Sequence, residues 1–205
     1  MNQTPKVIIF DAFGTLVKIG ESRHPYRRLM NWLKDNGRKP TTNDASIIMS
    51  NNLDFEELAV LFGKALPTEL LKEINHDLQF ELNTIMLFED VIPTLQILKD
   101  LGFKIALCSN LAKPYGDKLK TILPKNLFDV LVLSYEVDAI KPEINIYETL
   151  RTKLDFQMCE ALFIGDNPIL DVEVPISLGM SARLIERNKM QNLSDVLSDL
   201  LLKQE

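Results

Sequence analysis

The stretch Val7-Ile8-Ile9-Phe10-Asp11-Ala12-Phe13-Gly14-Thr15-Leu16 decides how this chain folds. Its apolar residues, without polar alternation, predict a strand that is covered on both faces, as in a parallel sheet. An aspartate and a glycine turn follow at once and place a carboxylate at the carboxyl end of that strand. A lone Asp in this position also fits a turn or a helix cap, so its role depends on the rest of the chain.

Further short apolar runs lie at 104–108, 130–134 and 161–164, with a weaker run at 182–185. Between them, apolar residues recur at three or four positions, which indicates helices. The clearest stripes are Ile92, Leu95, Leu98 and Leu101, and Leu193, Val196, Leu197 and Leu200. Strands that alternate with helices predict an α/β fold, a doubly wound parallel sheet with right-handed crossovers.

The interval from 18 to 88 interrupts this alternation. It shows no convincing strand, and Asp54 with Glu57 has the pattern of a helix start. The longest apolar series at helical spacing is Leu71, Ile74, Leu78, Leu82 and Ile85. We therefore expect a core domain of residues 1–17 and 89–205 and an inserted α-helical cap domain of residues 18–88. An insertion at the carboxyl end of a strand lies over the crevice where such sheets bind ligands, so it is placed to act as a lid.

Composition narrows the function classes. The 205 residues are 46% hydrophobic and 25% charged, which is typical of a globular protein and excludes a disordered or collagen-like chain. A formal net charge of −6 argues against nucleic-acid binding, which needs a basic face. The first residues form no apolar run long enough for a signal peptide or a membrane span, so we expect a cytoplasmic protein with no membrane partner. Cys108 and Cys159 lack the spacing of a zinc site, and we expect both to be core thiols.

Polar groups follow the expected strands in a fixed order. The motif residues are Asp11 after the first strand, Ser109-Asn110 after the second, Lys141-Pro142 after the third, and Gly165-Asp166-Asn167 with Asp171 at the fourth. In this order the chain resembles the haloacid dehalogenase (HAD) superfamily of hydrolases and phosphotransferases, from the first strand to about Met180. The resemblance implies a Rossmann-like core, and that family places a helical cap where the insertion falls here.

The resemblance also implies roles for individual side chains. Asp11 would be the nucleophile, forming an acyl-type intermediate that water then opens. Lys141 would supply positive charge beside it, and Ser109 would hold the oxygens of the group that is not transferred. Asn110 and Thr15 would serve substrate binding, Asn110 directly or by fixing its loop, and Thr15 by orienting the first loop.

A divalent cation, Mg²⁺, is the implied cofactor. By resemblance its ligands would be the Asp11 side chain, the Phe13 main-chain carbonyl and Asp166. Asp171 would be a further ligand or would support the ligands. Oxygen ligands of this kind are those that Mg²⁺ prefers. For Asp171 an equally good interpretation is that it caps the helix starting near Pro168.

Phe13 departs from the family pattern. Most phosphatases of the superfamily carry a second Asp two residues after the nucleophile, which protonates the leaving group and later activates water. General acid or base catalysis is typically worth about 10²- to 10⁴-fold. With an aromatic residue at this position, the first motif is similar to that of the 2-haloacid dehalogenases, whose aspartate displaces halide without a proton or a metal. A phosphate or anhydride with a good leaving group would also accommodate Phe13.

Asp166 favours phosphoryl chemistry instead. The matching residue of those dehalogenases is generally not an acid, and a carboxylate beside Asp11 without a cation would raise one of the two pKa values. We therefore expect a hydrolase, a Mg²⁺-dependent phosphatase that acts on a small phosphorylated metabolite through an aspartyl-phosphate on Asp11. The alternatives are a metal-independent 2-haloacid dehalogenase using Asp11 and a non-catalytic binder of a phosphorylated ligand or a protein.

The start of the insertion adds a basic cluster to an acidic chain. Arg23, His24 and Arg27 are candidates for binding the anionic part of the substrate, because an arginine can hold a carboxylate or phosphate with two hydrogen bonds. Solvated helix charge is the competing interpretation for each of them. The expected partner is a small anionic molecule, and the sequence is compatible with a monomer or a homodimer.

Overall fold

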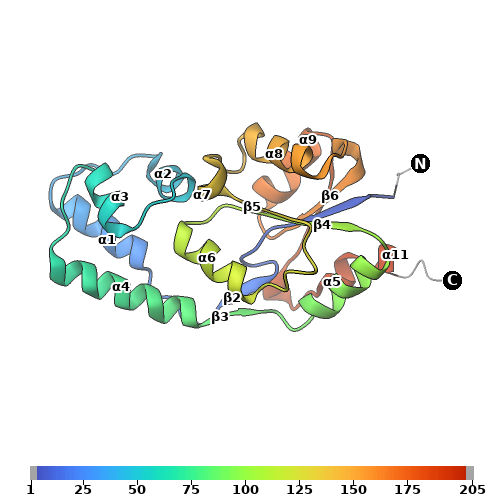
Figure 1. Cartoon of the computed structure of the whole chain (residues 1–205), viewed down its shortest axis with the longest axis horizontal. Helices are drawn as coiled ribbons and strands as arrows, with labels where there is room; N and C mark the ends of the chain where they lie inside the picture. The colour runs from blue at the N-terminus through green and yellow to red at the C-terminus, as the bar shows by residue number, and fades with distance from the viewer. Residues whose placement is uncertain (1–3, 202–205) are drawn as a thin grey trace.

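The computed structural model describes residues 4–201, and its centre is a five-stranded parallel sheet (Figure 1). The strands are β1 Val7–Phe10, β4 Lys104–Ser109, β5 Val130–Leu133, β6 Ala161–Gly165 and β7 Ser181–Leu184. Their order across the sheet is β5-β4-β1-β6-β7, and every neighbouring pair is parallel. The doubly wound α/β sheet is thus confirmed. The chain extends the sheet to one side of β1 and then to the other, a reversal that favours ligand binding at the carboxyl end of β1.

β1 is buried on both faces, as its unbroken apolar run predicts. Ile8 and Phe10 belong to one core cluster, whereas Val7 and Ile9 belong to the other. Helices within residues 91–122 and 193–201 contribute to the first cluster, and helices within residues 144–177 to the second. Full burial of each such side chain stabilises the fold by about 1.5 to 3 kcal/mol.

The core helices lie on both sides of the sheet in Figure 1. Their bounds are α5 Val91–Asp100, α6 Lys113–Ile122, α7 Ser134–Val137, α8 Ile144–Leu154, α9 Val174–Ser177, α10 Leu193–Val196 and α11 Ser198–Leu201. Short 3-10 turns span Met158–Glu160 and Arg187–Lys189, and a π-helical segment spans Pro168–Glu173.

The inserted segment, residues 18–88, is called the cap below, and it extends from one end of the sheet (Figure 1). Its helices are α1 Pro25–Asp35, α2 Asp44–Ser50, α3 Phe55–Leu61 and α4 Thr68–Asn83. The helix start at Asp54 is confirmed, because Glu57 N donates to Asp54 Oδ1 and Asp54 N donates to Glu57 Oε2, both at 2.9 Å. Arg28 on α1 pairs with Glu73 and Asp77 on α4, which ties the first and last cap helices together.

The expectation that 18–88 contains no strand is wrong at both of its ends. β2 (Val17–Ile19) and β3 (Ile85–Leu87) form a separate antiparallel pair where the chain leaves and re-enters the core. Helix α4 ends at Asn83, so Ile85 belongs to β3 and not to the helical stripe. Strands of three residues are too short to show an alternating pattern, and each depends on a partner far along the chain.

Two other expectations need correction. The stripe at 193–200 is confirmed as buried, but Ile92 of the first stripe is 47% exposed, and Val91 and Thr94 face the core with Leu95 instead. Two neighbouring apolar residues gave the helix two possible faces, and packing selected one. Cys108 is buried as expected, whereas Cys159 is exposed. Within residues 4–201, none of the helices combines the length and apolar character that crossing a membrane requires.

Candidate active site

Asp11 begins the loop that follows β1. Its backbone N–H donates to Ile164 O at 2.9 Å, which continues the pairing with β6 beyond the strand. The N–H groups of Leu16 and Val17 both donate to Ala12 O, at 2.8 and 3.0 Å, so the loop closes tightly on itself. The Asp11 carboxylate is thereby held at the middle of the sheet edge and is only 7% exposed.

Gly14 allows this loop to approach β6. Its φ of 77° lies in the left-handed region that glycine adopts without strain. A Cβ atom at this position would lie 2.1 Å from Asp166 Oδ2. The glycine in the first motif therefore brings the loop of Asp11 against the carboxylate that follows β6.

Arg187 holds the same loop from the other side. Its Nε and Nη2 donate to Thr15 O at 3.0 and 2.7 Å, and its Nη1 donates to both oxygens of Asp90 at 2.9 and 2.8 Å. The Thr15 side chain is fully buried, and its hydroxyl has no hydrogen-bond partner within residues 4–201. Thr15 thus contributes to loop position through its carbonyl. Sequence reasoning missed Arg187, which lies outside every motif and bears no local signal.

Lys141 joins two of the carboxylates. Its Nζ donates to Asp11 Oδ1 at 2.7 Å and to Asp171 Oδ1 at 2.6 Å. The side chains of Lys141 and Asp171 are 2% and 1% exposed. One oxygen from each of Asp11, Asp166 and Asp171 lies within 4.8 Å of the others. The structure therefore brings together the four charged residues that the motif order singled out.

Burial and mutual repulsion shape the electrostatics of this site. Burial raises the pKa of Asp11 to about 6, and the charges of Asp171 and Asp166 add to this shift while Lys141 opposes it. Burial, followed by repulsion from Asp171, also raises the pKa of Asp166. For Lys141, burial lowers the pKa, but Asp11 and Asp171 outweigh it and hold the pKa above its ordinary value. Three carboxylates face one ammonium, so their ionised forms leave two negative charges uncompensated.

The donor set fits a divalent cation such as Mg²⁺, which takes carboxylate oxygens and balances two negative charges. Lys141 engages Oδ1 of Asp11, whereas Oδ2 of Asp11 has no hydrogen-bond partner in the described part of the chain. Asp171 has both oxygens engaged, because Asn167 N donates to its Oδ2 at 3.0 Å. Asp11 and Asp166 are therefore better placed to hold a cation than Asp171, which orients Lys141.

Asn167, and not Asp171, caps the helical segment that begins at Pro168. Its Oδ1 accepts hydrogen bonds from Ile169 N and Leu170 N at 3.0 and 2.9 Å. The interpretation of Asp171 as the helix cap is therefore wrong. Asn before a proline at the first helical position is a strong N-cap signal, which places the cap four residues before Asp171.

Asn110 fixes the loop that carries Lys141. Its Nδ2 donates to Lys141 O at 2.8 Å, and Lys141 N donates to Asn110 Oδ1 at 2.7 Å. Of the two roles expected for Asn110, the structure shows the loop-fixing one. Ser109 ends β4 opposite Leu133 of β5 and is 2% exposed, so it lies at the same edge of the sheet.

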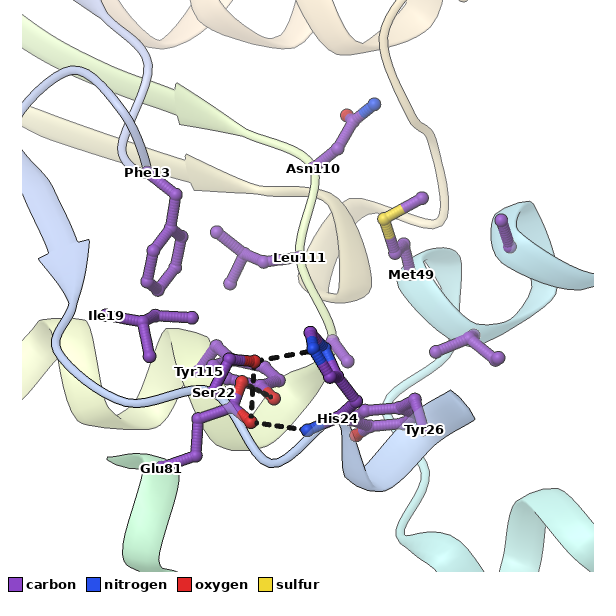
Figure 2. Close-up of a pocket in the computed structure, with 13 residues that line it drawn as sticks. Phe13, Ile19, Ser22, His24, Tyr26, Met49, Glu81, Asn110, Leu111 and Tyr115 are labelled. Carbon is purple, nitrogen blue, oxygen red and sulfur yellow. Dashed lines mark hydrogen bonds between the residues drawn. The ribbon is translucent and has the colours of Figure 1, made fainter. Parts of the chain in front are cut away.

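A cavity of about 450 Å³ lies between this edge and the cap (Figure 2). Most of its lining is apolar, with Phe13, Ile19, Tyr26, Ile48, Met49 and Leu111 among the residues that face it. The ring of Phe13 extends from the first loop and packs edge-on against Tyr115, with ring centres 5.8 Å apart. Asn110 also lines the cavity, so the cavity adjoins the loops that carry Asp11 and Lys141.

The three basic residues proposed from the sequence are divided by the structure. His24 lines the cavity, and its ring points into it in Figure 2. Arg23 pairs with Glu21 at 3.0 Å and stacks 3.7 Å from the ring centre of Phe80, so it is not brought to the cavity wall. Arg27 is exposed on α1 and is not part of the lining either.

Glu81 is a buried carboxylate in the cavity wall that sequence reasoning missed. Its Oε2 accepts hydrogen bonds from Arg23 N, His24 N and Ser22 Oγ at 2.8, 3.0 and 3.2 Å. Its Oε1 accepts one from Tyr115 OH on α6 at 2.8 Å, so it joins the cap to the core. Nothing in the sequence distinguishes this glutamate from the solvated charges of an ordinary helix.

Comparison with known proteins identifies the family of this chain. A family model for haloacid dehalogenase-like hydrolases matches residues 5–179. A glyceraldehyde 3-phosphate phosphatase from Methanopyrus kandleri is 33% identical over 107 residues, which are 52% of this chain and 46% of that protein. The pyrophosphatase PpaX from Bacillus anthracis is 32% identical over 97 residues, or 47% of this chain and 44% of that protein. The matched region thus spans less than half the length of each relative.

The fold has also been observed in solved structures. A HAD family enzyme from Bacteroides thetaiotaomicron, crystallised in complex with magnesium and inorganic phosphate, superposes with a TM-score of 0.63. The comparison covers 88% of this chain and 93% of that one, at 18% sequence identity. At this level of identity the likeness establishes a common fold.

Proposed function

The chain belongs to the haloacid dehalogenase-like hydrolase family, and from this we propose that it is a phosphatase with Asp11 as its nucleophile. The substrate class is a small phosphorylated compound, and the proposed cofactor is Mg²⁺. The observation that carries the proposal is the gathering of three carboxylates around Lys141 at one edge of the sheet.

This charge arrangement favours a phosphatase over a dehalogenase. Burial raises the pKa of Asp11, and the charges of Asp171 and Asp166 add to this, so that Lys141 alone does not bring the pKa back to its ordinary value. A further cation would favour the ionised nucleophile. A displacement of halide from carbon gains nothing from such a site, whereas a carboxylate approaching a phosphate dianion needs positive charge between the two. The names of the two curated relatives, a phosphatase and a pyrophosphatase, support the same choice.

In the proposed reaction, an oxygen of Asp11 attacks phosphorus, and the bond from phosphorus to the leaving oxygen breaks with its electron pair on that oxygen. Water then attacks the phosphorus of the aspartyl-phosphate, which releases inorganic phosphate and restores the Asp11 carboxylate. Lys141 positions Asp11 and offsets charge on the phosphoryl oxygens. Asn110 keeps Lys141 in place, and Asp171 holds its ammonium from the opposite side.

Mg²⁺ would be held by Asp11 and Asp166, with Asp171 next to them. When bound, it would supply positive charge that lowers the repulsion between the nucleophile and the phosphoryl oxygens. The Phe13 main-chain carbonyl belongs to the same loop and remains a candidate ligand by family resemblance.

The test is a comparison of phosphate and chloride release. The protein is incubated with phenyl phosphate and separately with 2-chloropropionate, each with Mg²⁺ and with a chelator. We expect phosphate release that requires Mg²⁺ and is lost in Asp11→Asn, which keeps the size of the side chain but removes the nucleophile. Chloride release that resists the chelator would instead establish the dehalogenase. Silence on both substrates, equal to that of Asp11→Asn, would leave the binder as the better account.

A further inference from the structure

The walls of the cavity described above differ in charge from the adjoining sheet edge that carries Asp11 and Lys141. No lysine or arginine from the described ranges lines the cavity. Lys141 lies outside the lining, and its backbone is hydrogen-bonded to Asn110 of the lining. The one carboxylate in the wall, Glu81, is 3% exposed and is held by hydrogen bonds from the cap and from Tyr115. A leaving group with its own negative charge would lose water there and face Glu81 without a cation to pair with.

The shape and chemistry of the lining suit a flat apolar group. Phe13, Tyr26 and Tyr115 contribute aromatic surface, and Phe13 stands edge-on to Tyr115. Ile48 and Met49 on the cap helix α2 add aliphatic surface. A volume of about 450 Å³ lies in the range of cavities that bind small organic molecules.

The polar groups of the cavity are largely committed to the protein. The Tyr115 hydroxyl donates to Glu81, and Asn110 is engaged with the backbone of Lys141. His24 uses its backbone N–H for Glu81 and its Nδ1 for Ser22, which leaves Nε2 for a polar atom of a ligand. The buried hydroxyl of Tyr26, also in the lining, has no hydrogen-bond partner within the described residues. Such a wall recognises a mostly apolar molecule with few and uncharged polar substituents.

Phe13 constrains the same part of the substrate. Phe13 is the residue two positions after Asp11, it lines the cavity, and its hydrocarbon ring cannot donate a proton to a leaving group. A leaving oxygen that departs without a proton donor must be a weak base. The pKa of a phenol is near 10, whereas that of an alkyl alcohol is close to the 15.7 of water. A phenolate is therefore a far weaker base than an alkoxide. The cavity wall and Phe13 therefore both favour an uncharged phenol-type leaving group.

We propose that the substrate is a phosphate monoester of an uncharged, flat and largely apolar phenol-type alcohol, with its ring in the cavity between Phe13 and the cap. This inference rests on the proposed phosphatase activity and names its substrate class. Asp11 takes the phosphoryl group, the bond from phosphorus to the phenolic oxygen breaks, and the phenolate leaves with the electron pair and is protonated by solvent. Water then releases phosphate from Asp11.

A matched pair of substrates separates this inference from simple chemical reactivity. Phenyl phosphate and 4-carboxyphenyl phosphate share the ring, but the second adds a negative charge and has the less basic leaving oxygen. Reactivity alone favours the carboxylated compound, whereas the cavity favours phenyl phosphate. We expect kcat/KM for phenyl phosphate to be at least about tenfold higher, the lower end of discrimination by pocket contacts. Equal rates, or faster turnover of the charged compound, would overturn the inference while leaving the phosphatase intact.

Substitution of Met49 tests whether the cavity is responsible. Met49→Lys adds a cation to the wall, and we expect it to reduce the preference for phenyl phosphate by about tenfold, whereas Met49→Leu keeps an apolar wall and the preference. A preference that is the same in both variants would show that the ring does not lie in this cavity. Absence of Asp11-dependent phosphate release from every compound, an alkyl phosphate included, would overturn the proposed function and the inference together.

Discussion

The sheet edge and the cap wall hold their charges in opposite ways. At the edge, Lys141 faces three carboxylates, and their negative charge exceeds what one ammonium can balance. In the wall, Glu81 is surrounded by neutral donors from Ser22, Tyr115 and the backbone. The edge thus carries excess negative charge that the proposed cation would balance, whereas the carboxylate of the wall already has its hydrogen bonds and the cavity leaves space for an uncharged group.

The largest effect is expected from removal of Lys141, which changes the charge balance at the sheet edge. Lys141→Met removes the ammonium that pairs with Asp11 and Asp171, so we expect phosphate release to fall by about 10²- to 10³-fold. The same change is expected to lower the free energy of unfolding by about 3 to 5 kcal/mol, measured by denaturant titration without metal. Adding Asp171→Asn to Lys141→Met should restore part of the stability but none of the activity. Recovery of both would contradict the assigned role of Lys141.

Cation binding can distinguish the sheet edge from the cap wall without any substrate. If Mg²⁺ binds at Asp11 and Asp166, a concentration of 100 times its Kd stabilises the fold by about 2.7 kcal/mol, or about 5 to 10 °C in Tm for a chain of this size. Thermal unfolding with and without Mg²⁺ measures this shift. We expect Asp166→Asn to abolish it. The matched change Glu81→Gln in the cap wall should leave it in place, and equal loss in both variants would contradict the site.

A carboxylate at position 13 tests whether the lack of a proton donor in the first loop limits the choice of leaving group. Phe13→Asp supplies a proton donor, and we expect it to raise kcat/KM for an alkyl phosphate by about 10- to 100-fold while changing that for phenyl phosphate much less. Steady-state phosphate release from ethyl and phenyl phosphate gives the ratio. Phe13→Asn has nearly the same size but cannot transfer a proton, so an equal gain in that variant would show that the effect is steric.

The smallest effect on chemistry is expected from the ion pair inside the cap. Arg38 donates to both oxygens of Asp44 at 2.7 and 2.6 Å, and these hydrogen bonds hold the pKa of Asp44 well below its usual range. A depressed pKa contributes stability above the unfolded-state value near 3.9, and this stability is lost as pH falls toward the folded-state pKa. Asp44→Asn should therefore reduce stability by about 2 kcal/mol at pH 7 and by less below pH 4.

Unfolding measured as a function of pH checks this prediction. The matched change Asp77→Asn removes a more exposed carboxylate of the cap and should cost less than about 1 kcal/mol. A difference between wild type and Asp44→Asn that grows as the solution is acidified would contradict the assignment. Turnover of phenyl phosphate should change little in either variant, because neither carboxylate lines the cavity.

The sequence by itself determined the sheet and the positions of its charged groups. Short apolar runs without polar alternation, separated by segments of helical period, indicate strands covered on both faces, and the residue after each run then lies at one edge of the sheet. Asp11 and Asp166 could be placed in this way without coordinates, whereas the roles expected for Lys141 and Asp171, which lie several residues beyond their strands, came from the family resemblance. The capping pair of Asp54 and Glu57 was equally local, because both hydrogen bonds lie within one turn.

Tertiary structure alone decided the partners of the site. Arg187 reaches Thr15 and Glu81 reaches Tyr115 from distant parts of the chain, and no local pattern distinguishes either residue from a solvated charge. Packing also directed His24 into the cavity and Arg23 onto Phe80. Local sequence determines the apolar period of a helix or strand and where the element ends. The direction in which a loop side chain points depends instead on the contacts formed when the cap packs against the sheet.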